Sequence, residues 1–293
     1  MAAATASSID QLLPKATQAP SDVLSNASES STESTYKVLY FGLHGRGEMT
    51  RTLLVYGGAR FEEIPLQWPA MKTDTRFGCL PVSLYCPWIY VVPRQLLLLY
   101  EFSLIDIVSF HIFLISQVLY ETTSSGTVLE LAETLAIERY LARKFNLLGS
   151  NAWEEHLVNE YVYSTESLNN NFNKILFASD LEVRQKEAEV FYRDHLSRWI
   201  QTHERHLAEK QNGHYVGDKI TLADIRTMVM VDRIMFMVPK GQDESVNKIF
   251  NRETAPGLWK VRDTVNAHPL IAAWKKSQRH QEIDAGTKGF FKF

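Results

Sequence analysis

The sequence predicts an α/β unit followed by an all-helical unit. Residues 36–66 have the pattern strand–helix–strand, and residues 118–144 have the pattern strand–strand–helix. Beyond residue 150, apolar residues recur every three or four positions, which is the period of helices that bury one face. A chain of 293 residues with 45% hydrophobic residues is long enough to bury a sizeable core in one large or two ordinary domains.

The first three elements follow from composition and from their breakers. Tyr36 to Phe41 is rich in aromatic and β-branched residues and predicts a strand, which a turn at residues 42–45 ends. A helix is predicted from Glu48 to Tyr56, where two glycines stop it. A second strand then runs from Arg60 to Leu66. This order predicts that the two strands are parallel.

The later part of the α/β unit is predicted to be antiparallel. Val118 to Glu121 and Thr127 to Leu131 have strand composition, and a turn at residues 124–126 separates them. A helix from Glu133 to Lys144 completes the unit.

The remaining chain is predicted to be helical. Apolar spacing predicts one long helix from Trp153 to Phe177 and a second that includes Ala188 to Trp199. A third helix starts at Thr221, where Thr221 and Asp224 form a capping box. Shorter helices are predicted from Pro256 to Asn266 and from Pro269 to Gln278.

Composition excludes several classes of protein. The net charge of −3 and the absence of a long basic run predict no nucleic-acid binding. Two cysteines, Cys79 and Cys86, are too few for a disulfide framework and favour a reducing compartment, which we take to be the cytoplasm. His203 and His206 can share a helix face, but without a third ligand we interpret them as exposed polar residues and predict no metal site.

Residues 1–35 are rich in Ala, Ser and Thr and contain one Lys and no Arg. With so little apolar content the segment is predicted to be a disordered tail, and a targeting role is the alternative.

Residues 82–117 form an anomalous apolar insertion. Their roughly fourteen strongly apolar residues nearly cancel against Glu101 and Asp106 on a membrane-transfer scale, so they predict a poor membrane span. Our hypothesis is an unspliced intron, because Val82-Ser83 can be encoded GTA-AGT and Gln117 can be encoded CAG. Sequencing the mature transcript tests this. If the insertion is translated, it exposes apolar surface beside the predicted site and weakens folding or binding.

Several motifs, in one order and spacing, carry a resemblance to a known family. They are Leu39-Tyr40-Phe41, Gly45-Arg46-Gly47-Glu48, Trp68-Pro69-Ala70-Met71-Lys72, Phe77-Gly78-Cys79-Leu80-Pro81-Val82, Leu131 to Ile137, and Val216-Gly217-Asp218 before the capping box. Together they resemble the sigma-like, tyrosine-dependent glutathione transferases over residues 36–281, apart from the insertion. The resemblance implies a thioredoxin-like glutathione-binding domain at residues 36–148, an α-helical domain at residues 149–293, and a homodimer.

The resemblance assigns thiol activation to Tyr40. An unperturbed thiol titrates near pH 8.5, so only a few per cent is the nucleophilic thiolate at pH 7. One hydrogen bond to the sulfur anion can lower the thiol pKa by about one unit, which corresponds to roughly 1.4 kcal/mol. Arg46, at the start of the first helix, is expected to support the thiolate and Tyr40. The alternatives are a core tyrosine and a surface arginine.

The resemblance also implies a set of glutathione-binding residues. Trp68 and Lys72 match positions that contact the glycyl end, and Lys72 would pair with its carboxylate. Leu80 and Pro81 match a cis-proline turn that faces the cysteinyl part. Glu133 and Thr134 open a helix, whose free N–H groups favour the γ-glutamyl carboxylate. Cys79 is expected to be passive, because thiol–disulfide enzymes of this fold carry their cysteine at the first helix.

The predicted function is conjugation of glutathione thiolate to an apolar electrophile, with glutathione as co-substrate. Two alternatives stay open: a non-catalytic binding protein of the same fold, and a glutathione-dependent isomerase of the prostaglandin D synthase type. Such isomerases carry acidic residues on the first long helix, where this chain has Glu166 and Ser167, an incomplete match. The sequence does not identify the electrophile.

Overall fold

The computed structural model describes residues 34–65, 117–178, 180–238 and 243–291. Its sheet consists of β1 (Thr35–Tyr40), β2 (Arg60–Pro65), β3 (Val118–Thr122) and β4 (Val128–Ala132), in the order β2-β1-β3-β4. β1 and β2 are parallel, whereas β3 pairs antiparallel with both β1 and β4. The predicted fold class, a thioredoxin-like α/β part followed by a helical part, is confirmed.

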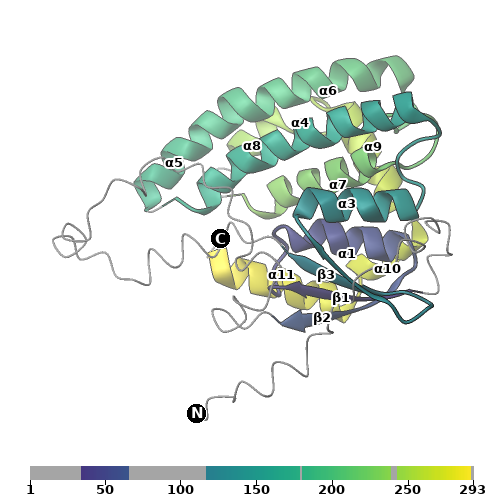
Figure 1. Ribbon diagram of the computed structural model, residues 1–293. Helices are drawn as coiled ribbons and strands as arrows, with labels where there is room; N and C mark the ends of the chain where they lie inside the picture. The colour runs from purple at the N-terminus through teal and green to yellow at the C-terminus, as the bar shows by residue number, and fades with distance from the viewer. Residues whose placement is uncertain (1–33, 66–116, 179, 239–242, 292–293) are drawn as a thin grey trace, which may run out of the picture.

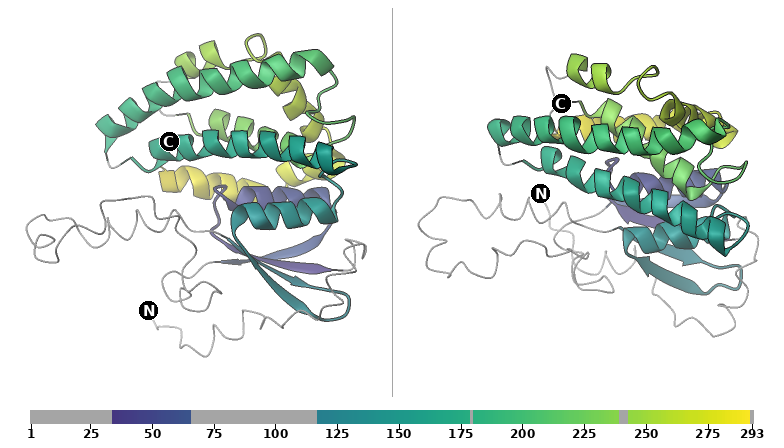
Figure 2. Two further views of the ribbon diagram at one scale, coloured as in Figure 1. Left: turned by 45° about the horizontal axis from the view of Figure 1, so that its top comes forward. Right: turned by 90° about the horizontal axis from the view of Figure 1, so that it is seen from above.

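Two helices lie against the sheet. Figure 2 shows α1 (Gly47–Tyr56) and α3 (Thr134–Lys144) between the sheet and the helices that follow. α1 buries Met49, Leu53 and Leu54, and α3 buries Ile137 and Leu141. Met49 and Leu53, like Ile137 and Leu141, are four residues apart, so each helix turns an apolar face to its neighbours.

The rest of the described chain is helical. The helices are α4 (Ala152–Leu176), α5 (Leu181–Val190), η3 (Phe191–Leu196, π-helical), α6 (Ser197–Lys210), α7 (Leu222–Phe236), α8 (Asp243–Ile249), α9 (Pro256–Asn266), α10 (Pro269–Lys275) and α11 (Gln278–Phe291). The second predicted long helix is thus α5, η3 and α6 in continuous succession. In Figure 1 it runs alongside α4 over the top of the molecule.

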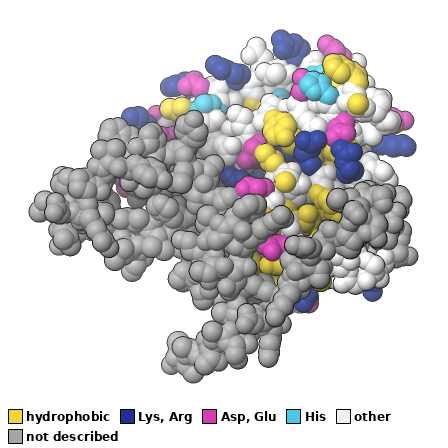
Figure 3. Space-filling view, viewed as in Figure 1, with side chains coloured by type: hydrophobic (Ala, Val, Ile, Leu, Met, Phe, Trp, Pro, Cys, Tyr) yellow, Lys and Arg dark blue, Asp and Glu magenta, His cyan; other side chains and the backbone are white. Residues whose placement is uncertain are grey.

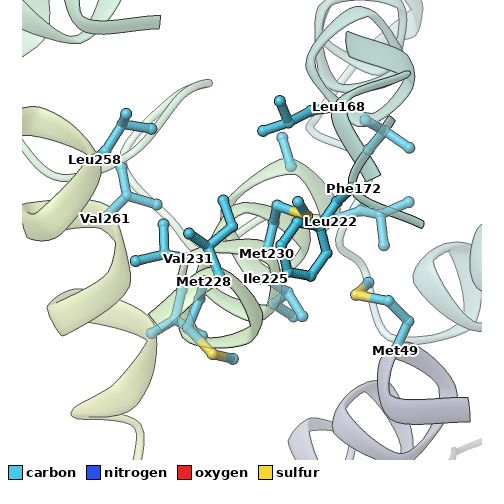
Figure 4. Close-up of a cluster of buried hydrophobic side chains, with 14 of the residues drawn as sticks. Met49, Leu168, Phe172, Leu222, Ile225, Met228, Met230, Val231, Leu258 and Val261 are labelled. Atoms are coloured by element: carbon cyan, nitrogen blue, oxygen red, sulfur yellow. The ribbon is translucent and has the colours of Figure 1, made fainter. Parts of the chain in front are cut away.

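The centre of the helical core is α7. Figure 4 shows side chains of α7 between Leu168 and Phe172 of α4 and Leu258 and Val261 of α9, with Met49 of α1 close by. The predicted capping box is present at the start of α7, where the Thr221 N–H donates to Asp224 Oδ2 at 2.7 Å.

One surface view shows how charge is distributed. In Figure 3, acidic and basic side chains are interspersed over the described helical face, with hydrophobic side chains between them. Among the described residues of this face there is therefore no broad patch of a single charge, in keeping with the small net charge.

Two helices, α8 and α11, were not predicted from the sequence. The longer of these, α11, buries only Ile283, Thr287 and Phe291. These residues form a single row at four-residue spacing, and polar residues and two glycines surround them. Such a narrow stripe gives a weak periodic signal, so packing on the rest of the molecule decides that this segment is helical.

The interpretation of His203 as an exposed side chain was wrong. His203 is buried beneath Tyr215, Ser164 and Trp199, with Nδ1 2.6 Å from the Tyr215 hydroxyl and Nε2 3.0 Å from Ser164 Oγ. Burial lowers the pKa of His203 to about 3, so the ring is neutral at pH 7. A histidine whose two nitrogens both have partners can be buried at low cost, and this was not visible in the helix pattern alone.

Most of the insertion and residues 1–33 of the predicted tail lie outside the described residues. The predicted end of the tail at residue 35 was wrong, because Thr35 is the first residue of β1 and pairs with Arg60. Gln117, the last residue of the insertion, is described, and its side-chain amide donates to Thr50 Oγ1 inside the protein. The predicted strand begins at the next residue, Val118. Within the described ranges, every helix is too short or too polar to cross a membrane.

Candidate active site

Tyr40 is the last residue of β1, and its ring is buried. The backbone N–H of Arg46 donates a hydrogen bond to the Tyr40 hydroxyl oxygen at 3.0 Å. Because the phenol is the acceptor in this contact, its own hydrogen remains available to a third group. The contact also brings the partially positive hydrogen of the Arg46 N–H against the oxygen, and this polarisation strengthens the hydroxyl as a donor.

Two glycines allow the loop to wrap around this ring. A Cβ atom on Gly45 would lie 2.4 Å from the Tyr40 hydroxyl oxygen, and one on Gly47 would lie 2.4 Å from Tyr40 Cδ1. Gly45 also has a φ of +36°, a conformation that side chains disfavour. The Gly-Arg-Gly sequence therefore lets the backbone approach the tyrosine closely enough to donate to its oxygen.

The side chain of Arg46 points to a different partner. Its Nη1 lies 3.8 Å from Oε1 of Glu166 on α4. The contact between Arg46 and Tyr40 thus comes from the backbone, and the guanidinium faces an acidic group of the helical part. The predicted electrostatic role of Arg46 toward a thiolate stays a prediction.

A second arginine near Tyr40, Arg51, was not predicted from the sequence. Arg51 is fully buried, and its guanidinium carbon lies 5.7 Å from the centre of the Tyr40 ring. It donates to the carbonyl oxygens of Phe41 and Leu43, each at 2.8 Å, and to Glu63 on β2. Arg51 therefore fixes the first residues of the loop after Tyr40. The available signal was an arginine within the apolar sequence of α1.

The other end of the candidate site is the start of α3. Thr134, the first helical residue, is buried, and its hydroxyl has no hydrogen-bond partner among the described residues. Glu133 precedes it, exposed and with a φ of +70°, which is uncommon for a residue other than glycine. The first N–H groups of the helix have no partner within it. Within the described part of the chain, this end therefore leaves the Thr134 hydroxyl available to a ligand.

A small cavity of about 30 Å³ joins the two ends. Arg46 and Thr134 both line it, together with Glu138, Glu166 and Arg226. The volume of this cavity is far below the roughly 300 to 1,000 Å³ of small-molecule sites.

The four other predicted binding residues, Trp68, Lys72, Leu80 and Pro81, lie outside the described residues, as does Cys79.

A buried ion-pair network forms the wall of this cavity. Arg226 of α7 bonds both Glu138 of α3 and Glu166 of α4. Burial raises the pKa of Glu138, Arg226 opposes this shift, and Glu166 adds to it. Glu138 and Arg226 are 88 residues apart in the sequence, so no local pattern could have predicted the pair.

A larger cavity of about 370 Å³ also borders the loop at residues 41–46, the Tyr40 loop. Gly45 lines both cavities. The apolar wall of the larger one comes from α7 and the residue after it, namely Met228, Val229, Met235, Phe236 and Met237. Its volume lies within the range of small-molecule pockets.

Comparison with known proteins identifies the family. A family model described as glutathione S-transferase, C-terminal domain, matches residues 166–278. The chain is 31% identical over 202 residues to "Probable glutathione S-transferase 7" of Caenorhabditis elegans, covering 65% of this chain and 75% of that protein. This chain belongs to the glutathione S-transferase family.

Other members of the glutathione S-transferase family resemble it more distantly. "Hematopoietic prostaglandin D synthase" of Gallus gallus is 24% identical over 245 residues, which cover 82% of this chain and 94% of that one. The solved structure of the "Fasciola hepatica sigma class GST" has a TM-score of 0.61 and 20% identity, covering 83% of this chain and 96% of that one. The latter similarity shows the shared fold.

Proposed function

We propose that this member of the glutathione S-transferase family transfers glutathione to apolar electrophiles and that Tyr40 stabilises the thiolate. The observation that carries the proposal is the hydrogen bond from the Arg46 N–H to the Tyr40 oxygen. This hydrogen bond leaves the phenol hydrogen free to donate to a sulfur anion. Arg51 donates to two carbonyl oxygens of the loop after Tyr40, and the glycines of the loop let its backbone approach the ring.

Glutathione is proposed to lie from Tyr40 to the start of α3. Its γ-glutamyl carboxylate would accept from Thr134 and the free N–H groups beside it, and its ammonium would meet Glu133. Trp68, Lys72, Leu80 and Pro81 complete the proposed glutathione site, with Lys72 as the counter-charge of the glycyl carboxylate. Arg46 adds positive charge near the sulfur.

The larger cavity is a candidate for the electrophile. Its apolar wall along α7 suits an apolar molecule, and Gly45 connects it to the loop that holds Tyr40. A position between the proposed glutathione site and the first long helix, α4, is the alternative. A homodimer, a cytoplasmic location and a domain boundary at residues 148/149 are further parts of the proposal. Light scattering of the purified chain tests the homodimer.

The decisive test is turnover of glutathione with a chloronitrobenzene. Tyr40→Phe removes only the hydroxyl, and we expect kcat to fall about 100-fold, as for loss of one preorganised donor. Ultraviolet difference spectra should show a bound thiolate in the unsubstituted chain and a weaker signal in the variant. The matched control is Tyr163→Phe, because Tyr163 is half exposed on α4.

Two outcomes would contradict the proposal. A folded chain that is retained on immobilised glutathione but is inactive would indicate a non-catalytic binding protein. Equal turnover of the Tyr40→Phe variant and the unsubstituted chain would exclude Tyr40 as the activating group.

The similarity to a prostaglandin D synthase along 94% of that protein favours a second candidate, a glutathione-dependent isomerase. Both reactions need the same thiolate and differ in the second substrate. Glu166, the one acidic residue of that incomplete pattern, is already bonded to Arg226, which weakens the case for an isomerase. Assaying prostaglandin H₂ isomerisation beside conjugation separates the two.

A further inference from the structure

Two histidine–carboxylate pairs face each other beside the larger cavity, and the proposed transferase chemistry uses neither. His44 and Glu48 lie four residues apart where the Tyr40 loop enters α1. His280 and Asp284 lie four residues apart on α11. In Figure 1, α11 lies near α1 and the sheet, so the chain brings together segments that are about 240 residues apart.

The four side chains form one connected cluster. His44 Nδ1 lies 2.9 Å from Glu48 Oε2, and His44 Nε2 lies 2.6 Å from Asp284 Oδ1. His280 Nδ1 lies 3.6 Å from Asp284 Oδ2, and this buried nitrogen makes no hydrogen bond among the described residues. His44, His280 and Asp284 each offer one potential ligand atom, and these three atoms lie within 4.8 Å of one another.

We propose that His44, His280 and Asp284 bind a divalent transition metal ion of the zinc type. Two imidazole nitrogens and one carboxylate oxygen are a donor set that Zn²⁺ and its first-row neighbours accept, whereas Mg²⁺ and Ca²⁺ prefer oxygen ligands alone. The unpartnered His280 nitrogen then has a function. The metal ion replaces the proton between His44 Nε2 and Asp284, and this proton is released.

Glu48 completes the cluster as an outer partner. With His44 Nε2 on the metal, Nδ1–H donates to Glu48, the carboxylate–histidine–metal arrangement that fixes ring orientation. Arg51 lies 3.7 Å from the same Glu48 oxygen, which favours a hydrogen-bonding role for Glu48 over direct ligation. The other charges lining this cavity largely pair among themselves, as Asp232 does with Lys275 and Arg262.

The surroundings hold both rings in place and leave one side open. The edge of Phe236 packs against His44 with ring centres 5.4 Å apart, and Trp274 packs against His280 at 5.8 Å. His44, His280 and Asp284 all line the cavity of about 370 Å³, so a fourth coordination position can face it. The ion would tie α11 to the residue before Gly45.

No metal site was predicted from the sequence, because only His203 and His206 were considered as ligands. The relevant signal is two His-x-x-x-carboxylate patterns, at His44 and His280. They could be joined only once α11 was known to be a helix packed on the Tyr40 loop.

The test is metal binding by the full chain after treatment with a chelator and desalting. Calorimetric titration with Zn²⁺ should show one equivalent bound, and binding should raise the melting temperature. Co²⁺ should bind at the same site and give a visible absorption band. Mg²⁺ should bind far more weakly than Zn²⁺.

Single substitutions identify the ligands. His280→Ala and Asp284→Asn should each weaken Zn²⁺ binding at least about 100-fold, and Glu48→Gln about tenfold, as expected for an outer partner. The matched control is His156→Ala, which removes the exposed histidine of another i,i+4 pair, His156 with Glu160. Replacing Cys79 and Cys86 by Ser in all chains removes thiol ligands.

Circular dichroism establishes that each variant is folded, and His280→Gln replaces His280→Ala if the latter is not. Absence of stoichiometric Zn²⁺ binding would overturn the proposal. Binding that survives both the His280 and the Asp284 substitutions would also overturn it, as would equal affinity for Mg²⁺.

Discussion

The two ends of the candidate site differ in how fully the described residues satisfy their polar groups. At the Tyr40 loop, the phenol oxygen accepts from Arg46, and Arg51 donates to two loop carbonyls. At the start of α3, the buried Thr134 hydroxyl has no partner among the described residues. The first end is thus preorganised for chemistry, whereas the second retains donors that a bound ligand can use.

The largest effect is expected from Gly47→Ala, which tests the preorganised end. Alanine normally stabilises a helix by roughly 0.5 to 1 kcal/mol relative to glycine. Here the new Cβ would lie 2.4 Å from the Tyr40 ring, so we expect the ring to move. The chain should lose about 1 to 3 kcal/mol of stability, and kcat should fall about 100-fold, as for Tyr40→Phe.

Gly42→Ala is the matched control, because a Cβ on Gly42 meets nothing within 4 Å. Urea unfolding and turnover of both variants supply the measurement. If Gly47→Ala stabilised the chain and kept full activity, the close fit around Tyr40 would have no functional meaning.

Local sequence predicted much of the preorganised end and little of its support. The strand that ends at Tyr40, the glycines after it and the helix that follows all have short-range signals in composition and spacing. The buried charges do not, because their partners are distant in sequence. Glu63 is 12 residues from Arg51, and Glu138 is 88 residues from Arg226. Burial of an arginine is decided by a carboxylate that the fold brings to it.

The same reasoning applies to the helical part. The capping box of α7 depends on residues three apart, so Thr221 and Asp224 were enough to predict it. His203 depends on Tyr215 and Ser164, which come from other segments, and was wrongly interpreted as exposed. Contacts between residues of one helical turn could be predicted from the sequence, whereas contacts with a second helix or loop could not.

The second largest effect is the loss of folding stability expected at acidic pH. This loss limits the pH range in which variants at the two ends of the site can be compared. The pKa of His203 is lowered from 6.5 to about 3 in the folded chain, first by burial and then by His206. Below pH 6.5 the unfolded chain binds a proton that the folded chain does not. The stability is therefore complete above pH 6.5 and is lost as the pH falls toward 3, by about 2 kcal/mol at pH 5.

Urea unfolding at pH 7 and pH 5 measures this loss. His203→Gln removes the titrating group. Between these pH values, the variant should therefore lose about 2 kcal/mol less stability than the unsubstituted chain. His156→Gln, which removes an exposed histidine, should behave as the unsubstituted chain does. Parallel pH profiles in all three chains would show that His203 is not the source. Variants at the two ends of the site should therefore be compared above pH 6.5, where this loss of stability is absent.

The smallest effect is expected from Thr134→Val, which tests the open end. Loss of a buried hydroxyl without a partner should leave stability unchanged or slightly raised, since no protein hydrogen bond is broken. If the hydroxyl instead meets the γ-glutamyl carboxylate, KM for glutathione should rise about tenfold, equivalent to about 1.4 kcal/mol, while kcat stays nearly constant. Thr134→Ser keeps the hydroxyl and should keep the affinity.

An effect of Gly47→Ala on kcat together with an effect of Thr134→Val on KM would establish that one end of the site performs chemistry and the other binds. An unchanged KM for Thr134→Val would mean that the free hydroxyl is not a glutathione contact, and the proposed position of the γ-glutamyl group at α3 would have to be abandoned.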